Sequence, residues 1–506
     1  MSTTLTQPQT THAAKSVWVH YPSLYEINTW VWLTDLSAKY GKPIDLSSVP
    51  SAEWDAIAAY GFNAVWLMGV WERSPAGIAI ANQNHSLLAD FRNALPDFRT
   101  EDNVGSAYSI RRYVVDAHFG GPAALATARA ELAKRGMNLV LDFVPNHVAP
   151  DNPWSTEHPE YFIEISVDEA HKNPASFISV NGIQCACGRD PYFPPWPDVL
   201  QLNAFSPQLR QAVIDTLSSI AEQCDGVRCD MAMILLNSVF ERTWGTRVGP
   251  PPATEYWSDV ITAIKKRHPG FVFIAEAYWD LEWQLQQLGF NFCYDKKLYD
   301  RLEHGPAETV RLHLCAAMAY QAKLIRFIEN HDEPRAAAAF SPEKERAVAV
   351  TTFTLPGAKL YYEGQLEGRS VRPPVFLDRR PSEPVDQALH TFYVKLLAQV
   401  NRPLFHDGLW SLLDRSGWPD NATFQNLIAW SWQLNDDRCL IAVNLSDHPL
   451  QALVHVPWAG NRTWDLTDVF DGITYRRDGN EMASRGLYVE VAPWAFNFFR
   501  AVEACV

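Results

Sequence analysis

Short apolar runs alternate with helical patterns from about residue 20 to about residue 400. Eight such runs predict strands, at Leu24–Thr29, Asn63–Met68, Asn138–Val144, Gly226–Cys229, Phe271–Ala275, Phe290–Tyr294, Lys323–Ile328 and Ala358–Tyr362. Helices are predicted between most of them, at Ala52–Tyr60, Ala123–Arg135, Ser206–Gln223, Thr254–Arg267 and Glu343–Phe353. Near-continuous apolar runs are typical of parallel strands that are buried on both faces. Eight alternations in one unit favour an α/β fold of the closed (β/α)₈ TIM-barrel type over an open sheet.

Two long insertions interrupt this rhythm. Trp71–Ala107 is expected to be a long loop after the second strand, and Val148–Asn203, rich in proline and aromatic residues, follows the third. Because loops that follow strands lie at the catalytic face of such a barrel, both insertions are expected to wall a cleft.

The pattern changes at about Leu404. Strand-like runs then follow one another without a long helix, at Leu427–Gln433, Cys439–Leu445, Gln451–Val456 and Leu487–Val491. This predicts a C-terminal all-β sandwich. We therefore expect a loose tail over residues 1–16, a barrel over 17–403 with an inserted small domain at 148–203, and the sandwich over 404–506.

Composition narrows the classes of function. Hydrophobic residues make up 47% and charged residues 20% of the chain, as in ordinary globular proteins. The formal net charge of −15 argues against nucleic-acid binding. No apolar stretch reaches the roughly 18 residues that a membrane span needs, and the polar N-terminus lacks the apolar region of a secretory signal. The eight scattered cysteines predict no disulfide framework, and Cys185-Ala-Cys187 lacks the second pair of a zinc site, so we expect reduced thiols and a cytoplasmic protein.

Polar side chains follow four of the predicted strands. The third strand ends in Asp142-Phe-Val-Pro-Asn-His147, the fourth in Arg228-Cys-Asp230 and the fifth in Glu276, and the seventh runs into His331-Asp332. In a barrel these ends converge on one face. A single aspartate at a strand end is often the N-cap of the next helix. Four such ends in this order are much harder to explain as helix caps.

Carboxylates in such a cluster suit the cleavage of a glycosidic bond. That reaction uses one protonated carboxyl group as a donor and one ionised carboxylate as a nucleophile. Arg228 lies two residues before Asp230, on the same side of a strand, so its cation is expected to lower the pKa of Asp230. Only apolar residues directly precede Glu276, and an apolar setting is expected to raise its pKa, as suits a proton donor.

These segments resemble the four signature regions of the α-amylase superfamily, glycoside hydrolase family 13. The resemblance covers roughly residues 20 to 500. Four ordered motifs carry it: Asp142-Phe-Val-Pro-Asn-His147, Gly226-Val-Arg-Cys-Asp230, Ala275-Glu-Ala-Tyr278 and Glu329-Asn-His-Asp332. Weaker matches support the second and eighth strands, at Gly61-Phe-Asn-Ala-Val-Trp-Leu67 and Tyr361-Tyr-Glu-Gly364.

The resemblance implies a retaining mechanism and a role for each matched residue. Asp230 matches the nucleophile, Glu276 the general acid/base and Asp332 the transition-state stabiliser. The residues that it implies as ligands of the sugar are Tyr108, Asp142, His147, Arg228, His331 and Arg335. For Tyr108 a plain packing role is the alternative to that of an aromatic platform.

The chain also departs from the family's pattern. Met231-Ala-Met-Ile234 follows the matched nucleophile where many starch-degrading members carry Lys-His, so the product side of the cleft is expected to differ from that of a typical α-amylase. Many relatives hold a structural Ca²⁺ with the residue matched by Asn146 and with an aspartate, and here Gln201 stands in the place of that aspartate.

Ca²⁺ prefers anionic oxygen ligands, and an amide supplies no charge. We therefore expect no cofactor and no obligatory metal, although Asp151, Asp168 and Asp190 lie in the same insertion and could supply charge. Instead, Val148–Asn203 is expected to be fixed by the packing of four aromatic residues, Trp154, Tyr192, Phe193 and Trp196.

Three functions are compatible with these motifs. The first, which we favour, is a hydrolase of α-linked gluco-oligosaccharides. The second is a transglycosylase or phosphorylase that uses the same glycosyl-enzyme, and the third is a carbohydrate-binding protein without catalysis. The presence of Asp230, Glu276 and Asp332 disfavours the third. The acceptor that reaches the intermediate separates the first two, and the sequence leaves this acceptor, the linkage and the oligomeric state open.

Overall fold

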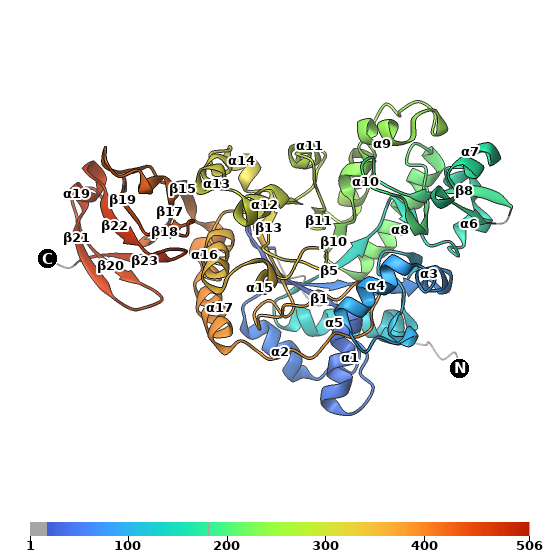
Figure 1. Ribbon diagram of the computed structural model, residues 1–506, viewed down its shortest axis with the longest axis horizontal. Coiled ribbons are helices and arrows are strands. Elements are labelled where there is room, and N and C mark those ends of the chain that lie inside the picture. The colour runs from blue at the N-terminus through green and yellow to red at the C-terminus, as the bar shows by residue number, and fades with distance from the viewer. Residues whose placement is uncertain (1–17, 181, 505–506) are drawn as a thin grey trace, which may run out of the picture.

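The computed structural model describes residues 18–180 and 182–504, so the tail predicted over residues 1–16 lies outside the described part of the chain. A closed barrel of eight parallel strands forms its centre, in the order β1-β14-β13-β12-β11-β10-β5-β2 (Figure 1). These strands are β1 (Ser23–Asn28), β2 (Ala64–Met68), β5 (Asn138–Phe143), β10 (Gly226–Cys229), β11 (Val272–Ala275), β12 (Phe292–Tyr294), β13 (Leu324–Arg326) and β14 (Ala358–Tyr362). All eight predicted strands and the TIM-barrel fold are thus confirmed.

The five predicted helices are confirmed as α2 (Ser51–Ala59), α5 (Gly121–Lys134), α8 (Pro207–Gln223), α10 (Tyr256–Arg267) and α16 (Pro342–Phe353). A local signal explains how α8 begins. The Ser206 side chain accepts a hydrogen bond from the backbone N–H of Leu209, and Pro207 opens α8. These helices cover the barrel and return the chain to the start of each next strand.

The first insertion is not a long loop, so that prediction is wrong. It contains β3 (Trp71–Arg73), α3 (Pro75–Ala81) and α4 (His85–Ala94), and β3 pairs with β4 (Ile110–Val115). Both helices have side-chain caps, Ser74 for α3 and Asn84 for α4. They are short and bury few residues, so their apolar periodicity is too weak to predict them.

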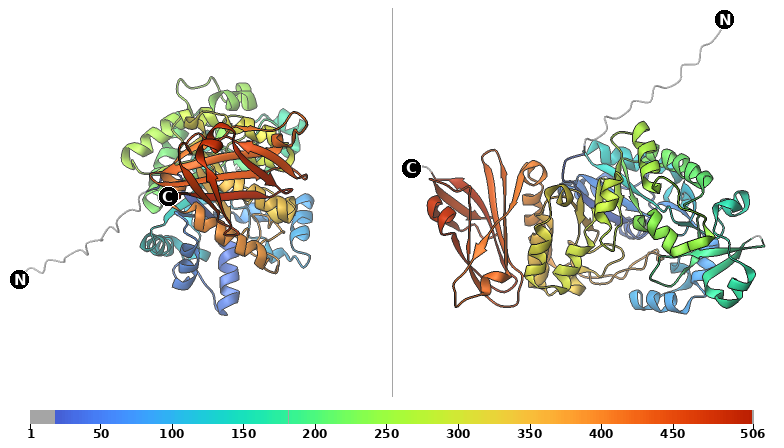
Figure 2. Two further views of the ribbon diagram at one scale, coloured as in Figure 1. Left: turned by 90° about the vertical axis from the view of Figure 1, so that its left-hand side faces the viewer. Right: turned by 90° about the horizontal axis from the view of Figure 1, so that it is seen from above.

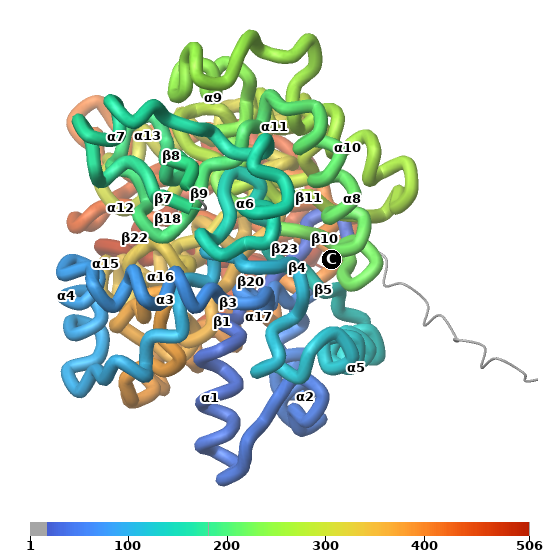
Figure 3. The backbone as a smooth tube through the Cα atoms, turned by 90° about the vertical axis from the view of Figure 1, so that its right-hand side faces the viewer, coloured from blue at the N-terminus to red at the C-terminus, as the bar shows by residue number. Residues whose placement is uncertain are grey.

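The second insertion folds around an antiparallel sheet in the order β6-β9-β8-β7, made of β6 (His147–Val148), β9 (Trp196–Gln201), β8 (Ile183–Gly188) and β7 (Phe177–Val180). Strand β9 contacts α3 of the first insertion, so both insertions lie on one side of the barrel (Figure 3).

Two of the four aromatic residues expected to fix the second insertion do not do so. Trp154 packs edge to face on Tyr161, and Trp196 packs against His147. Tyr192 and Phe193, however, are 58% and 65% exposed. Their backbone N–H groups donate to the Asp190 carboxylate, and this turn holds the two side chains at the surface.

A β domain forms the C-terminal part of the chain, at the end of the molecule opposite to the second insertion (Figures 1 and 2). A six-stranded sheet has the order β15-β17-β18-β23-β20-β21, and a three-stranded sheet the order β16-β19-β22. The four predicted strands are confirmed as β17 (Leu427–Leu434), β18 (Asp437–Asn444), β19 (Leu450–Val454) and β22 (Leu487–Val491). Five strands were not predicted: β15 (Leu409–Leu412), β16 (Arg415–Ser416), β20 (Thr463–Asp468), β21 (Thr474–Asp478) and β23 (Phe496–Glu503).

The domain limits at 148–203 and 403/404 remain predictions. Over the described ranges, no disulfide joins Cys185, Cys187, Cys224, Cys229, Cys293, Cys315 or Cys439. In the same part of the chain, we find no helix with the length and apolarity to cross a membrane.

Candidate active site

Three carboxylates meet around one guanidinium at the C-terminal ends of the barrel strands. Arg228, on β10, contacts Asp230 through Nη1 (2.6 Å to Oδ1) and Glu276 through Nη2 (2.8 Å to Oε2). The same Nη2 lies 3.9 Å from Oδ2 of Asp332. The structure therefore brings together residues from three separate strand ends, as the sequence predicted.

Aromatic rings surround the Arg228 side chain, which is 1% exposed. Its guanidinium carbon lies 5.5 Å from the ring centroid of Trp66, 5.1 Å from that of Tyr108 and 5.8 Å from that of Tyr294. Ring faces attract cations and restrict their movement. The guanidinium is thus fixed as a bridge between the carboxylates.

Glu276 is buried and hydrogen-bonded through both oxygens. Its Oε2 accepts from the backbone N–H of Met231 at 2.6 Å, and its Oε1 accepts from the Tyr278 hydroxyl at 2.8 Å. Met231 has φ of 45°, an uncommon conformation for a residue with a side chain, which aims its N–H at Glu276. Burial raises the pKa of Glu276 to about 7 against the opposing effect of Arg228, with the Asp230 charge adding to the increase. A carboxyl with this pKa keeps its proton in mildly acidic solution and serves as a general acid.

The expected direction of the Asp230 shift is wrong. Burial raises the pKa of Asp230, and the Arg228 cation, with its hydrogen bond, offsets this increase only in part. Arg228 still favours the ionised form of Asp230, because its Nη1 donates directly to Oδ1. Burial of the strand end, which the local sequence does not show, is the larger effect.

Asp332 is the most accessible of the three carboxylates, with 46% of its side chain exposed. The surrounding protein desolvates it, but the neighbouring His331, whose Nε2 lies 3.0 Å from Oδ2, outweighs this and holds the pKa of Asp332 well below its usual range. His331 in turn contacts the buried Glu26 carboxylate through Nδ1. Burial disfavours the imidazolium, yet Asp332 and Glu26 together raise the pKa of His331 to about 10. His331 is therefore a cation that keeps Asp332 ionised.

Tyr108 and His147 complete the wall of the site. The Tyr108 ring stacks on His331 with centroids 5.2 Å apart, and its hydroxyl lies 2.7 Å from His331 Nε2. Tyr108 is only half-buried, so one part of its ring is free for a ligand, consistent with the implied platform. Burial lowers the pKa of His147 to about 4, so its ring is neutral.

Two predicted sugar ligands are placed differently. Asp142 is completely buried and accepts from the Gly69 N–H at 2.8 Å, which ties the end of β2 to β5. Arg335 is 2% exposed and is engaged by the Glu329 carboxylate at 2.9 Å and by the Glu363 carbonyl at 2.8 Å. Both side chains thus have partners within the protein, and their role as sugar ligands stays a prediction.

Sequence reasoning missed Glu26 and Tyr278. Glu26 interrupts the otherwise apolar and aromatic centre of β1, and a carboxylate in a strand buried on both faces is the signal that could have found it. Tyr278 lies within the fifth-strand motif, two residues beyond Glu276, but its hydrogen bond depends on the turn that follows β11.

An aromatic shelf lies at the chain segment that follows Glu276. It consists of Trp279, which follows Tyr278, and Tyr192 of the second insertion, whose rings meet edge to face with centroids 4.7 Å apart. Next to Tyr192 is a cavity of about 370 Å³, also lined by Phe193, Arg189 and Arg242.

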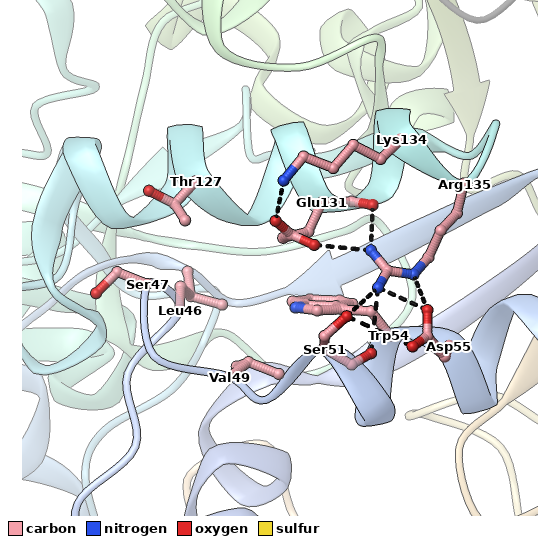
Figure 4. A pocket seen from close by; sticks show the side chains of 10 residues that line it. All are labelled: Leu46, Ser47, Val49, Ser51, Trp54, Asp55, Thr127, Glu131, Lys134 and Arg135. Carbon is pink, nitrogen blue, oxygen red and sulfur yellow. Dashed lines mark hydrogen bonds and ion pairs between the residues drawn. The ribbon is translucent and has the colours of Figure 1, made fainter.

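Another cavity, of about 490 Å³, lies on the barrel wall between α2 and α5 (Figure 4). Arg135 crosses it with ion pairs to Glu131 and Asp55, as the dashed lines show. None of the three carboxylates around Arg228 lines it, so it is separate from the candidate site.

Comparison with known proteins gives consistent results. The family described as alpha amylase, catalytic domain, matches residues 52–372. The α-amylase MalA of Haloarcula japonica is 24% identical over 329 residues, which cover 63% of this chain and 41% of MalA. The α-1,4-glucan:maltose-1-phosphate maltosyltransferase of Rhodospirillum rubrum is 27% identical over 285 residues, covering 51% and 34%. The chain thus spans less than half the length of these relatives. The maltogenic α-amylase AmyB of Thermotoga neapolitana shares the fold, with a TM-score of 0.67, 18% identity, and coverage of 96% of this chain and 99% of AmyB.

Proposed function

The chain belongs to the α-amylase family, and from this premise we propose that it is a retaining enzyme that acts on α-linked gluco-oligosaccharides through a covalent intermediate on Asp230. One observation carries the proposal: Arg228 contacts both Asp230 and Glu276. Two carboxylates on one guanidinium favour the short separation, about 5–5.5 Å, that retaining enzymes use, over the wider one that leaves room for a water in inverting enzymes.

In the first step, the Asp230 carboxylate attacks the anomeric carbon as the bond to the leaving oxygen breaks. Glu276 gives its proton to that oxygen, and the ionised Asp332 stabilises the positive charge that develops on the sugar. In the second step, Glu276 takes a proton from the acceptor hydroxyl, whose oxygen attacks the same carbon and releases Asp230. Two displacements at one carbon retain the α configuration.

Hydrolysis is the first candidate reaction, with water as the acceptor. Transfer to a second sugar is the alternative, and the shelf of Trp279 and Tyr192 supports it. The general acid lies on the side of the leaving group, so the residues beyond Glu276 adjoin the place where an acceptor sugar arrives. Tyr192 is exposed and Trp279 is half-buried, so both rings offer apolar surface on which a sugar ring can pack.

Product analysis tests both candidates. The protein is incubated with maltose, isomaltose, trehalose, sucrose and maltodextrins, with and without inorganic phosphate. Hydrolysis yields free reducing sugars alone, transfer yields longer or rearranged oligosaccharides, and phosphorolysis yields sugar phosphates only when phosphate is present. A protein that releases nothing from any α-glucoside contradicts the proposal.

A further inference from the structure

The Gln201 side chain is completely buried at the end of β9, surrounded by oxygen atoms. Its Nε2 lies 2.8 Å from Asn146 Oδ1, 3.0 Å from the Asn146 carbonyl oxygen and 2.9 Å from the Leu202 carbonyl oxygen. An amide nitrogen carries two hydrogens, so the three acceptors share them. Several carbonyl and amide oxygens that converge on one point are also the kind of ligand set that Ca²⁺ takes.

We infer that the Gln201 amide replaces the structural calcium ion that many members of the α-amylase family bind at this place, and that it prevents the cation from binding. The NH₂ group directs positive charge at the converging oxygens and occupies the space between them. The Gln201 Oε1 accepts from Asn146 Nδ2 at 3.2 Å and from the Arg189 N–H at 3.4 Å, so the two side-chain amides pair through both of their ends. The reverse orientation of the amide would set one oxygen against three others, so the hydrogen-bond network fixes the orientation shown.

Two of the three carboxylates that could replace the missing ligand, Asp151 and Asp190, have other partners. Asp151 accepts from the Ser74 hydroxyl at 2.5 Å and lies 3.6 Å from Arg111. Asp190 holds the backbone N–H groups of Tyr192 and Phe193. Across residues 18–180 and 182–504, no three acidic, histidine or cysteine side chains gather in a way that could hold a metal ion. The residues present therefore do not fit Ca²⁺.

Gln201 also reaches the active site through Asn146. Gln201 pairs with His147 across the β6–β9 ladder, and Asn146 Nδ2 lies 3.3 Å from His147 Nδ1. The amide thus ties the second insertion to the end of the third barrel strand and orients a residue of the cleft wall. This makes Gln201 a positioning residue, whose effect passes through His147. The inference about the metal holds whichever reaction the site performs.

Thermal melts of the full chain test the metal part. In wild type, the midpoint is expected to be the same in excess EDTA and in millimolar Ca²⁺. Gln201→Asp restores the anionic ligand, and its midpoint should fall in EDTA and rise with Ca²⁺. The matched control, Gln201→Leu, should melt at a lower temperature in both conditions with no response to Ca²⁺.

A wild-type midpoint that drops by several degrees in EDTA and recovers with Ca²⁺ overturns the inference. So does a Gln201→Asp protein that gains no response to Ca²⁺. Should that variant fail to fold, calorimetric titration of EDTA-treated wild type with CaCl₂ decides: no binding supports the inference, and one tight equivalent of Ca²⁺ overturns it.

A double-mutant cycle tests the positioning part on a maltodextrin, at a temperature where all variants are folded. Gln201→Leu is expected to lower kcat/KM in wild type but to have little further effect when His147 is already alanine, because its influence passes through that ring. Fully additive losses would mean that Gln201 has only a structural role, and would overturn this part.

Discussion

Replacing Glu276 with glutamine removes the transferable proton and keeps the shape of the side chain. The amide oxygen can still accept from the Met231 N–H, and the amide NH₂ can donate to the Tyr278 hydroxyl, so two of the three contacts survive. Only the ion pair with Arg228 is lost, and Asp230 remains to balance that cation. The variant is therefore expected to fold.

The expected loss of kcat follows from the role of Glu276 as general acid. General acid catalysis contributes typically about 10²–10⁴-fold, which corresponds to about 3–5 kcal/mol of activation free energy. Loss of kcat on a maltodextrin should lie in this range. On an α-glucosyl fluoride, whose leaving group needs no proton, the first step should be much less impaired.

The assay compares wild type and Glu276→Gln on both substrates, with Asp230→Asn as the matched control. Without the nucleophile, the rates on both substrates should fall severely, because the Asp230 carboxylate attacks the anomeric carbon whichever leaving group departs. Equal losses on maltodextrin and fluoride for Glu276→Gln would refute the assignment of the general acid.

Three further predictions follow from the buried charges and the shelf. Because a proton donor works only when protonated, the pKa of Glu276 of about 7 predicts that kcat/KM on maltodextrin falls as the pH rises above about 7. In acid, kcat/KM falls as well, because the Asp230 nucleophile takes up a proton. A kcat/KM that still rises in alkaline solution contradicts this pairing of acid and nucleophile. Asp295→Asn removes the carboxylate that lies 2.9 Å from His313 and 3.0 Å from Arg326. Because the buried Arg326 cation is then unpaired, denaturant titrations should show a loss of about 3–5 kcal/mol in the free energy of unfolding. A loss near zero would show that the ion pair contributes no net stability. Tyr192→Ala should lower the ratio of transfer to hydrolysis at high maltose concentration while leaving the hydrolysis rate of a short aryl glucoside unchanged; an unaltered ratio removes the support that the shelf gives to transfer.

The barrel could be predicted because its strands are short, continuous apolar runs that alternate with longer helical segments, two of which, α8 and α16, begin at a capping serine. β5, with the sequence NLVLDF, is buried along its whole length, as a strand between two other strands and under helices must be. The helices α3 and α4 could not be predicted in the same way, because each buries only a few residues and packs against distant parts of the chain. α3 contacts β9 of the second insertion, and α4 packs against Leu377, which follows β14.

Strand-end carboxylates show where sequence reasoning about a site stops. Asp295 follows β12 just as Asp230 follows β10, yet it contacts His313 and Arg326. These two partners outweigh its burial and lower the pKa of Asp295 to about 2. His313 lies on α13 (Ala307–Leu314), and the sequence around Asp295 does not predict their contact. Likewise Arg335, which follows a signature motif, forms an ion pair with Glu329. The partners that determine the role of each of these side chains come from distant parts of the chain, and only the fold places them in contact.

The configuration of the first product tests the central claim most directly. Proton NMR is recorded within the first minutes of cleavage of an α-linked maltodextrin, before mutarotation equilibrates the anomers. A covalent intermediate on Asp230 predicts that the α-anomer of the new reducing end, or of the transfer product, appears first and that the β-anomer grows in only slowly. A β-anomer that appears first would mean direct displacement by water, and would contradict the assignment of Asp230 as the nucleophile.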